Sequence, residues 1–284
     1  MMKNLSIKQS KLIRLTVTYL VISVMSIIVL YPLIWTVGAS FNPGNSLISS
    51  TIIPKNPTLS HYKSLFDTAN SDYLLWYWNT LKICIISMIL SVILVSFTAY
   101  SFSRFQFKGR KNGLMLFLIL QMIPQFSALI ALFVLANLTG LIDSHFALVL
   151  IYVGGSIPMN TYLMKGYLDS IPKELDESAR MDGAGHFRIF WQIIMPLAKP
   201  IIAVVAIFQF IGPFTDFILA RVILRSPENF TLAIGLYEMI SNQYGNKFTI
   251  FAAGAVLIAV PIAIVFLSLQ KYFVSGLTAG GTKG

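Results

Sequence analysis

Six long apolar segments restrict what this chain can fold into. They cover approximately residues 15–37, 81–103, 113–136, 146–164, 200–219 and 249–270. Each is close to the length of about 20 residues that an α-helix needs to cross a bilayer. Only 11% of the residues are charged, whereas soluble domains have about 25%. We therefore predict an all-α polytopic membrane protein with six transmembrane helices, because an apolar segment in lipid can satisfy its own backbone as a helix.

The distribution of basic residues predicts the orientation of these spans. Most of the 21 lysines and arginines fall in the N-terminal tail (1–14), the connections after the second and fourth spans, and the C-terminal tail (273–284). The positive-inside rule places these segments, and both termini, in the cytoplasm. The first span is longer than the about 7–15 apolar residues of a secretory signal, so we expect it to be retained. The six-span domain then covers 15–272, with a cytoplasmic loop at 165–199 and outer loops at 41–80 and 222–248.

Several classes of function do not fit the residues present. The net charge of +10 follows the predicted topology and forms no basic stripe with interleaved aromatic residues, which argues against nucleic-acid binding. Cys84 is the one cysteine, and His61, His145 and His186 lie in unlike contexts, so we expect neither a disulfide nor a metal site. The sequence contains no G-x-x-x-x-G-K-[ST] phosphate loop and no local signature of a catalytic triad. We therefore expect a chain that is not an enzyme and binds no cofactor itself.

The polar segment 165–199 differs from its apolar surroundings and is the first candidate for a functional element. Pro172 suits the first turn of a helix over 173–181, and residues 182–185 then interrupt that helix. A second short helix is expected over 186–194, with four large apolar residues spaced to share one face, namely Phe187, Phe190, Trp191 and Ile194. Such a unit can pass a push from a cytoplasmic partner into the membrane. The alternative is a solvated loop without a partner.

The same segment resembles the EAA loop of ABC importer permeases. The family pattern is Glu-Ala-Ala, three residues, Gly, nine residues, Ile, one residue, Leu-Pro. This chain matches it at five positions, which are Glu177, Ala179, Gly183, Ile193 and Pro196. It departs at two, with Ser178 in place of Ala and Met195 in place of Leu. The match falls in the predicted cytoplasmic loop before the fifth span, which makes it specific.

The resemblance extends along most of the chain and indicates the carbohydrate-uptake type of this family. Residues 105–110 and 140–143 are similar to the family, and 225–234 and the tail 276–284 are similar to the smaller permease of maltose and maltodextrin importers. It implies a MetI-like ABC permease architecture in the bacterial cell membrane. The implied partners are a second permease subunit, two ATPase subunits that bind ATP and Mg, an extracytoplasmic sugar-binding protein, the oligosaccharide and membrane lipid.

The resemblance also assigns roles to residues. The ATPase-coupling residues would be Glu177, Ser178, Ala179, Asp182, Gly183, Ala184 and Pro196. The tail would contact the ATPase subunits through Gly276, Thr278 and Lys283, and the loop 222–248 would insert into the binding protein. Maltose or maltodextrin is the substrate that the resemblance favours. Galacto-oligosaccharides, raffinose-type sugars and glycerol phosphate are the alternatives, because related importers share this architecture.

The substrate path is less readable from the sequence. Polar side chains within the spans at Gln121, Gln125, Asn160 and Gln209 could hydrogen-bond sugar hydroxyls, or could join helices to each other. Gly154, Gly155 and Ser156 are expected to be close-packing positions. We expect Asp216 to lie near the outer interface without a pathway role. A stand-alone secondary transporter is a further alternative, but the internal repeats and intramembrane charges of that class are not evident.

Overall fold

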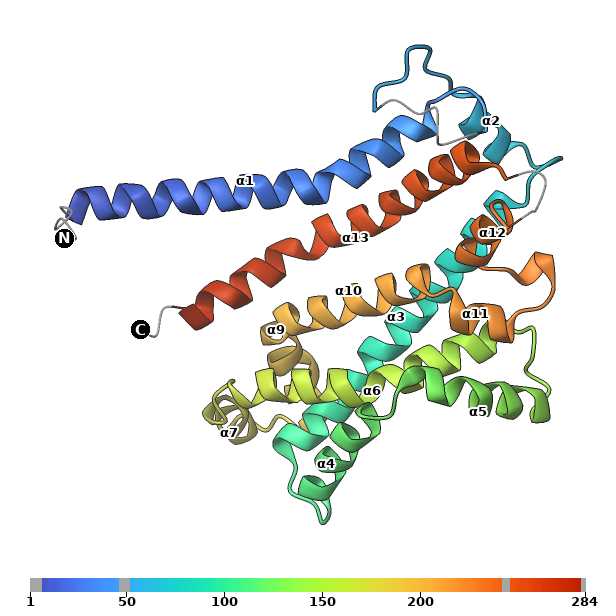
Figure 1. Ribbon diagram of the computed structural model, residues 1–284. Coiled ribbons are helices and arrows are strands. Elements are labelled where there is room, and N and C mark those ends of the chain that lie inside the picture. The colour runs from blue at the N-terminus through green and yellow to red at the C-terminus, as the bar shows by residue number, and fades with distance from the viewer. Residues whose placement is uncertain (1–6, 46–51, 242–245, 282–284) are drawn as a thin grey trace. The chain divides into compact units, whose positions relative to one another are not determined.

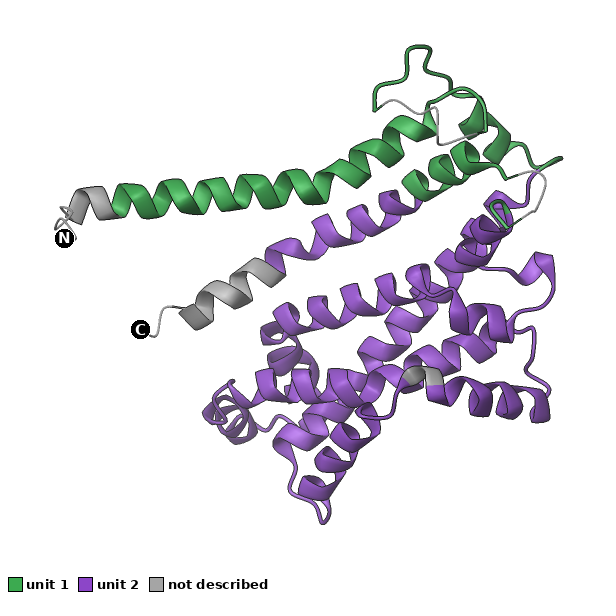
Figure 2. Cartoon of the chain, in the orientation of Figure 1, with its two compact units in different colours: residues 1–70, 239–257 green, residues 71–238, 258–284 purple. Residues whose placement is uncertain are grey.

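The computed structural model describes residues 7–45, 52–241 and 246–281. Every regular element within these ranges is a helix, from α1 (Ile7–Ser40) to α13 (Phe248–Gly281), as Figure 1 shows. The chain divides into two compact units (Figure 2), of which the first contains residues 1–70 and 239–257 and the second contains 71–238 and 258–284. The predicted all-α class is confirmed.

The remaining helices follow in chain order. They are α2 (Ser60–Phe66), α3 (Tyr73–Arg104), α4 (Arg110–Gln121), α5 (Gln125–Leu138), α6 (His145–Asp169), α7 (Glu174–Met181), α8 (His186–Ile189), the π-helix η1 (Phe190–Ile194), α9 (Met195–Leu197), α10 (Lys199–Thr215), α11 (Ile218–Ile223), the 3-10 helix η2 (Pro227–Asn229) and α12 (Leu232–Glu238). Within the described residues, α1, α3, α6 and α13 are each long and apolar enough to cross a membrane. The segment from α8 to α9 and α10 together form a fifth candidate that bends by 79°.

The predicted third and fifth spans differ from single straight helices. The segment 113–136 is divided between α4 and α5, of 12 and 14 residues, because Pro124 is extended (φ −60°, ψ 126°) and proline disfavours a helical residue before it. The predicted fifth span ends early, since α10 stops at Thr215. Asp216 is extended (ψ 116°) and its carboxylate accepts the backbone N–H groups of Leu219 and Ala220, which starts α11 in a new direction.

The first unit contains α1, α2 and the beginning of α13. The His61 ring approaches the Asn42 carbonyl at 2.8 Å, the Ser40 and Tyr62 hydroxyls lie 2.7 Å apart, and the Thr249 hydroxyl donates to the Gly44 carbonyl. The large apolar side chains of α1 are exposed along its length, so this helix requires an apolar surrounding such as lipid.

The second unit is organised around α3, which packs along α6 and α10. Its main core lies toward the C-terminal end of α3, where Val95 and Tyr100 pack with Met164, Ile189 and Phe190. A smaller core joins Cys84 of α3 to Phe210 and Phe214 of α10. As a result, α3 has α12 beside its first residues and α7 beyond its last ones (Figure 1).

Candidate functional site

The polar loop, defined here as residues 165–199, folds as a helix, a glycine turn and a second helical segment. The first helix, α7, ends in a Schellman motif, in which Gly183 has φ +78° and its N–H donates to Arg180. The N–H of Ala184 reaches the Ala179 carbonyl at 2.9 Å and completes the motif. Glycine suits this position because a left-handed backbone strains other residues. The predicted helix, turn and helix are therefore present.

The two sides of α7 have different exposure. Asp176 and Ala179 are buried, whereas Glu177, Ser178 and Asp182 are exposed. Among the other residues predicted for coupling, Gly183 and Pro196 are exposed, and Ala184 is half-buried against the core. The loop thus presents one side outward, where polar residues lie beside exposed apolar ones such as Met181, and holds the other against the helices of its own unit.

The predicted shared apolar face of the second helix is wrong. Phe190 and Ile194 are buried, but Phe187 and Trp191 are 71% and 48% exposed. The reason is the π-helical turn at Phe190–Ile194, which adds residues per turn and shifts the phase of the side chains.

A buried charged pair fixes the inner side of α7 to the end of α3. Arg104 Nε lies 2.6 Å from Asp176 Oδ2, and these side chains are 3% and 4% exposed. This is an ion-pair contact without the alignment of a hydrogen bond, because neither Nε nor the carboxylate oxygens meet hydrogen-bond geometry within the described residues. The other guanidinium nitrogens donate to the carbonyls of Leu168 and Ile171, each at 3.1 Å. One side chain therefore connects α3, the end of α6 and α7.

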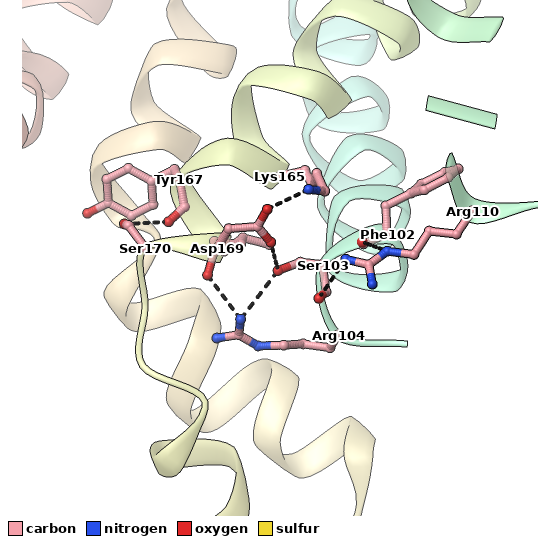
Figure 3. A network of polar contacts seen from close by, with 9 residues as sticks. Phe102, Ser103, Arg104, Arg110, Lys165, Tyr167, Asp169 and Ser170 are labelled. Carbon is pink, nitrogen blue, oxygen red and sulfur yellow. Dashed lines mark hydrogen bonds and ion pairs between the residues drawn. The ribbon is translucent and has the colours of Figure 1, made fainter. Parts of the chain in front are cut away.

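A further set of polar contacts surrounds this pair (Figure 3). The Ser103 hydroxyl donates to Asp169 at 2.7 Å, and Lys165 pairs with the other oxygen of that carboxylate. Arg110 donates to the carbonyls of Phe102 and Ser103 and closes the end of α3. The sequence interpretation used the arginine of the buried pair and Arg110 for topology, and Arg110 also for the family resemblance, and it missed this network. The available signal was an arginine directly after an apolar span, beside a loop rich in acids.

A cavity of about 810 Å³ lies in the second unit between the broken third span, α6 and α10. Three of the four residues predicted for the substrate path line it, namely Gln121, Asn160 and Gln209. The side chain of the fourth, Gln125, lies outside the described residues. The Asn160 amide donates to the Ser156 carbonyl, and the Gln209 amide oxygen accepts weakly from Ser91. Of these amides, Gln209 contacts another helix, whereas the Asn160 bond lies within α6. A role of the amides in sugar binding stays a prediction.

One expectation about this region is wrong, and another stays a prediction. Asp216 lines the cavity and accepts a 2.5 Å hydrogen bond from the Tyr152 hydroxyl, because the break after α10 turns its carboxylate toward α6. Its place near the outer interface, without a pathway role, stays a prediction. Gly154 and Gly155 are exposed on the cavity wall, and an added Cβ at either would meet nothing within 4 Å. They are open positions, since the bend at Pro124 leaves them uncovered within the described chain. Of the predicted close-packing residues, only Ser156 is buried, where it bonds Ser91 at 3.0 Å.

At the opposite end of α3, residues 223–238 form a second ordered region, named here the α12 platform. Trp76, Asn79 and Thr80 of α3 hydrogen-bond backbone groups between 227 and 232. Asp143, with φ +62°, accepts the N–H groups of Arg225 and Ser226. Burial alone raises the pKa of Asp143, but hydrogen bonds from Ser226, Arg225 and Asn229 outweigh it and lower the pKa to about 2. This carboxyl is therefore ionised at neutral pH.

Some predicted residues cannot be placed. Lys283 lies outside the described residues, and so do parts of both predicted outer loops, at 46–51 and 242–245. Gly276 and Thr278 belong to α13, but their surroundings are not described. Their predicted contact with ATPase subunits stays a prediction.

The described structure combines apolar helices, a mostly apolar cavity with several polar side chains on its wall, and a helix–turn–helix loop connected to the helix ends. The chain belongs to the family of binding-protein-dependent transport system inner membrane components, whose model matches residues 95–279. It is 60% identical to the galactooligosaccharides transport system permease protein GanQ of Bacillus subtilis (strain 168), over 98% of both chains. It is 51% identical to the maltodextrin transport system permease protein MdxG of the same strain, over 94% of this chain and 95% of the relative.

A solved structure supports the same fold. A chain of a bacterial ABC transporter involved in the import of the acidic polysaccharide alginate superposes with a TM-score of 0.79 at 25% identity, covering 93% of this chain and 98% of that chain. The predicted membership of the sugar-importing ABC permeases is therefore confirmed. The six spans and the cytoplasmic side of both termini stay predictions.

Proposed function

We propose that this chain is the permease subunit of an ATP-driven importer of uncharged oligosaccharides, working with a second permease, two ATPase subunits and an extracytoplasmic sugar-binding protein. The observation that supports it most is the cavity wall, which offers amides, a hydroxyl and one carboxylate from Gln121, Tyr152, Asn160, Gln209 and Asp216. Hydroxyl-rich sugars are bound by such donors and acceptors. ATP and Mg belong to the partner ATPase subunits, and this chain performs no catalysis itself.

The charge of the cavity favours a neutral cargo. Asp216 is the charged side chain of its lining, which contains no lysine or arginine among the described residues. A carboxylate without a neighbouring cation repels an anionic substrate such as glycerol phosphate. This argues against glycerol phosphate and leaves three neutral candidates. They are maltodextrin, which the sequence resemblance favours, galactooligosaccharides, which the name of the 60% identical relative favours, and raffinose-type sugars.

Uptake by the reconstituted importer shows whether maltodextrin or galactooligosaccharide is the substrate. Vesicles that contain this chain, its second permease and the ATPase subunits are supplied with the binding protein, ATP and radiolabelled maltodextrin or galactooligosaccharide. We expect ATP-dependent uptake of one or both, and none of glycerol phosphate. Uptake by this chain alone and without ATP is the outcome that contradicts an ABC importer.

The cavity itself can be tested by filling it. A Gly155→Trp substitution places an indole in open space, so we expect transport to fall to background while the ATPase subunits remain bound. Gly166→Trp is the matched control, because Gly166 lies on the same helix, is equally open and does not line the cavity. Normal uptake by the Gly155 variant would remove the cavity from the proposed path.

The exposed side of the polar loop is the proposed ATPase contact, through Glu177, Ser178, Asp182, Gly183 and Pro196, with Ala179 and Ala184 supporting it from below. A Gly183→Leu substitution strains the left-handed turn and adds bulk to this surface. We expect it to release the ATPase subunits and abolish uptake while leaving membrane insertion intact. Gly140→Leu is the control, because Gly140 also has a positive φ of 69° and open space but lies between α5 and α6. Retention of the ATPase by the Gly183 variant contradicts the proposed contact.

The proposal also includes a membrane topology. The chain crosses the membrane six times, with the α4–α5 segment and the bent α8–α10 segment each counted as one crossing. Both termini and the polar loop lie in the cytoplasm. Single cysteines at exposed Arg180 and Glu228 can be introduced into a Cys84→Ser background. A membrane-impermeant maleimide added to whole cells is expected to label position 228 and not 180. The reverse pattern contradicts the orientation.

A further inference from the structure

The contact between Arg104 and Asp176 is unusual because both charges are almost completely buried. Their side chains are 3% and 4% exposed and approach to 2.6 Å. Burying two charges costs several kcal/mol per ion before their attraction is counted, and a packed apolar pair of similar volume often stabilises a protein equally well. Stability alone is therefore a weak reason for a charged pair at this position.

The connections of Arg104 give a stronger reason. Its guanidinium donates to the carbonyls of Leu168 and Ile171 at the C-terminal end of α6, where helix carbonyls lack partners within the helix. A cation is also favoured there by the helix dipole. The same group holds Asp176 in α7, so the ends of two membrane helices and the loop helix are joined through one planar, rigid side chain.

The position of Asp176 on α7 completes the connection. It lies on the buried side of the helix, whereas its neighbours Glu177 and Ser178 are exposed. Within the described ranges, the other two ion pairs lie inside α6 and between α11 and α12, so this is the ion pair that joins the polar loop to a membrane-length helix. Force applied to the exposed side of α7 reaches α3 and α6 through it.

One of these two helices, α6, lines the cavity of the proposed transport path, and the other, α3, packs against it. α6 carries Tyr152, Gly155 and Asn160 on the cavity wall, and α3 packs along α6 and α10. Movement of α7 therefore changes the shape of the cavity only if it displaces the C-terminal ends of α3 and α6. This requires a contact that transmits both pushing and pulling. An ion pair with two supporting carbonyl contacts resists pulling as well as pushing, whereas an apolar contact can slide.

We propose that Arg104 and Asp176 are positioning residues that transmit the movement of the ATPase subunits from the polar loop to α3 and α6. This inference rests on the proposed function of the chain as an ABC permease. It predicts that removal of the charges uncouples ATP hydrolysis from transport without dissociating the complex. A purely structural pair predicts that assembly and coupling are lost or kept together.

The test uses the complete importer in proteoliposomes and measures sugar transported per ATP hydrolysed. The double variant Arg104→Met/Asp176→Leu replaces the pair with apolar side chains. We expect it to assemble and to hydrolyse ATP at a rate near that of the wild type, with the transport ratio lowered about tenfold or more, a size common for coupling between distant sites. Asp67→Leu/Asn70→Leu is the control, because that pair, joined by a 2.8 Å hydrogen bond, is exposed and lies outside both the polar loop and the loop 222–248.

Two conservative variants keep the test decisive if the double variant does not assemble. Asp176→Asn removes the negative charge at nearly constant side-chain shape. Arg104→Lys keeps the positive charge but loses the planar guanidinium that donates to several acceptors at once. We expect the Asn variant to be uncoupled and the Lys variant to retain most of the ratio. An unchanged ratio in an assembled double or Asn variant overturns the inference. If the wild-type complex shows no ATP-dependent uptake, the proposed function has failed instead.

Discussion

The two ends of α3 hold distant parts of the chain by opposite kinds of chemistry. At its beginning, three neutral side chains bond the α12 platform: Trp76 Nε1 donates to the Pro227 carbonyl at 2.9 Å, Asn79 donates to two further carbonyls, and Thr80 accepts the N–H of Leu232 at 2.7 Å. At its last residue, one cation holds the polar loop through a carboxylate and two carbonyls. Both attachments span more than sixty residues of sequence.

The difference determines how each attachment fails. Each neutral hydrogen bond contributes about 1 kcal/mol, so the platform can lose one and keep the others. It also bonds backbone atoms, which leaves the platform's own side chains free to vary. The charged attachment fails at once, because removal of one partner leaves the other charge buried and unpaired. One end of α3 is therefore held by several independent hydrogen bonds, and the other end by a single ion pair whose two partners depend on each other.

The largest effect is expected at the charged end. Arg104→Met leaves Asp176 buried without its cation and should destabilise the second unit by about 3–5 kcal/mol. The measurement is detergent-based unfolding of the purified chain. The double variant Arg104→Met/Asp176→Leu should recover most of the loss, since it buries no charge. Equal losses in the single and double variants contradict the description of this end as charge-dependent.

A steric change at the neutral end should cost less. Gly235 of α12 is so close to Trp76 that an added Cβ overlaps the indole ring, which is itself 9% exposed. Gly235→Val should therefore displace the platform at a cost of about 3 kcal/mol. Limited proteolysis between residues 223 and 238 reports the displacement. Gly166→Val, at an open helical glycine, is the control and should leave the cleavage pattern unchanged.

The sequence predicted the elements of this comparison better than their connections. Apolar length predicted the helices, and glycine predicted the turn at Gly183 correctly, because these depend on local preferences. The break at Pro124 divides a segment that was predicted as one span. The pairing of Arg104 with Asp176 could not be read locally, since 72 positions separate them and only the packing of α3 on α6 brings them together. The sequence also did not reveal that Asp216 lines the cavity, for the same reason. Its carboxylate faces α6 only because α10 ends where it does.

An intermediate effect is expected from one neutral side chain. The Asn79 amide donates to the carbonyls of Glu228 at 2.8 Å and Phe230 at 3.1 Å. Asn79→Leu removes both bonds and should cost about 2 kcal/mol, because buried carbonyls are left without donors. Hydrogen exchange of the platform amides should rise accordingly. Thr98→Val is the control, since its hydroxyl bonds only the Leu94 carbonyl of its own helix and is exposed. An equal rise in both variants contradicts a specific attachment.

The smallest effect concerns Asp143, whose carboxylate also attaches the platform. Because the pKa of Asp143 is lowered to about 2, its ionised form contributes stability above about pH 4, and this contribution is lost as the pH falls from about 4 toward 2. Exchange of the Arg225 and Ser226 amides, corrected for intrinsic rates, should therefore be constant between about pH 8 and 5 and rise only in acid.

Asp143→Asn separates the charge from the geometry of this residue. Asparagine tolerates the left-handed backbone and still offers an oxygen to the two N–H groups, so the change should lose only the contribution of the charge, about 1 kcal/mol after solvent screening. It should also abolish the acid-dependent rise in exchange. Asp143→Ala loses both the acceptor and the tolerance for positive φ and should loosen the platform at every pH. If the Asn variant instead behaves like the Ala variant, the platform depends on a charge, and the contrast between the two ends of α3 is one of burial rather than of chemistry.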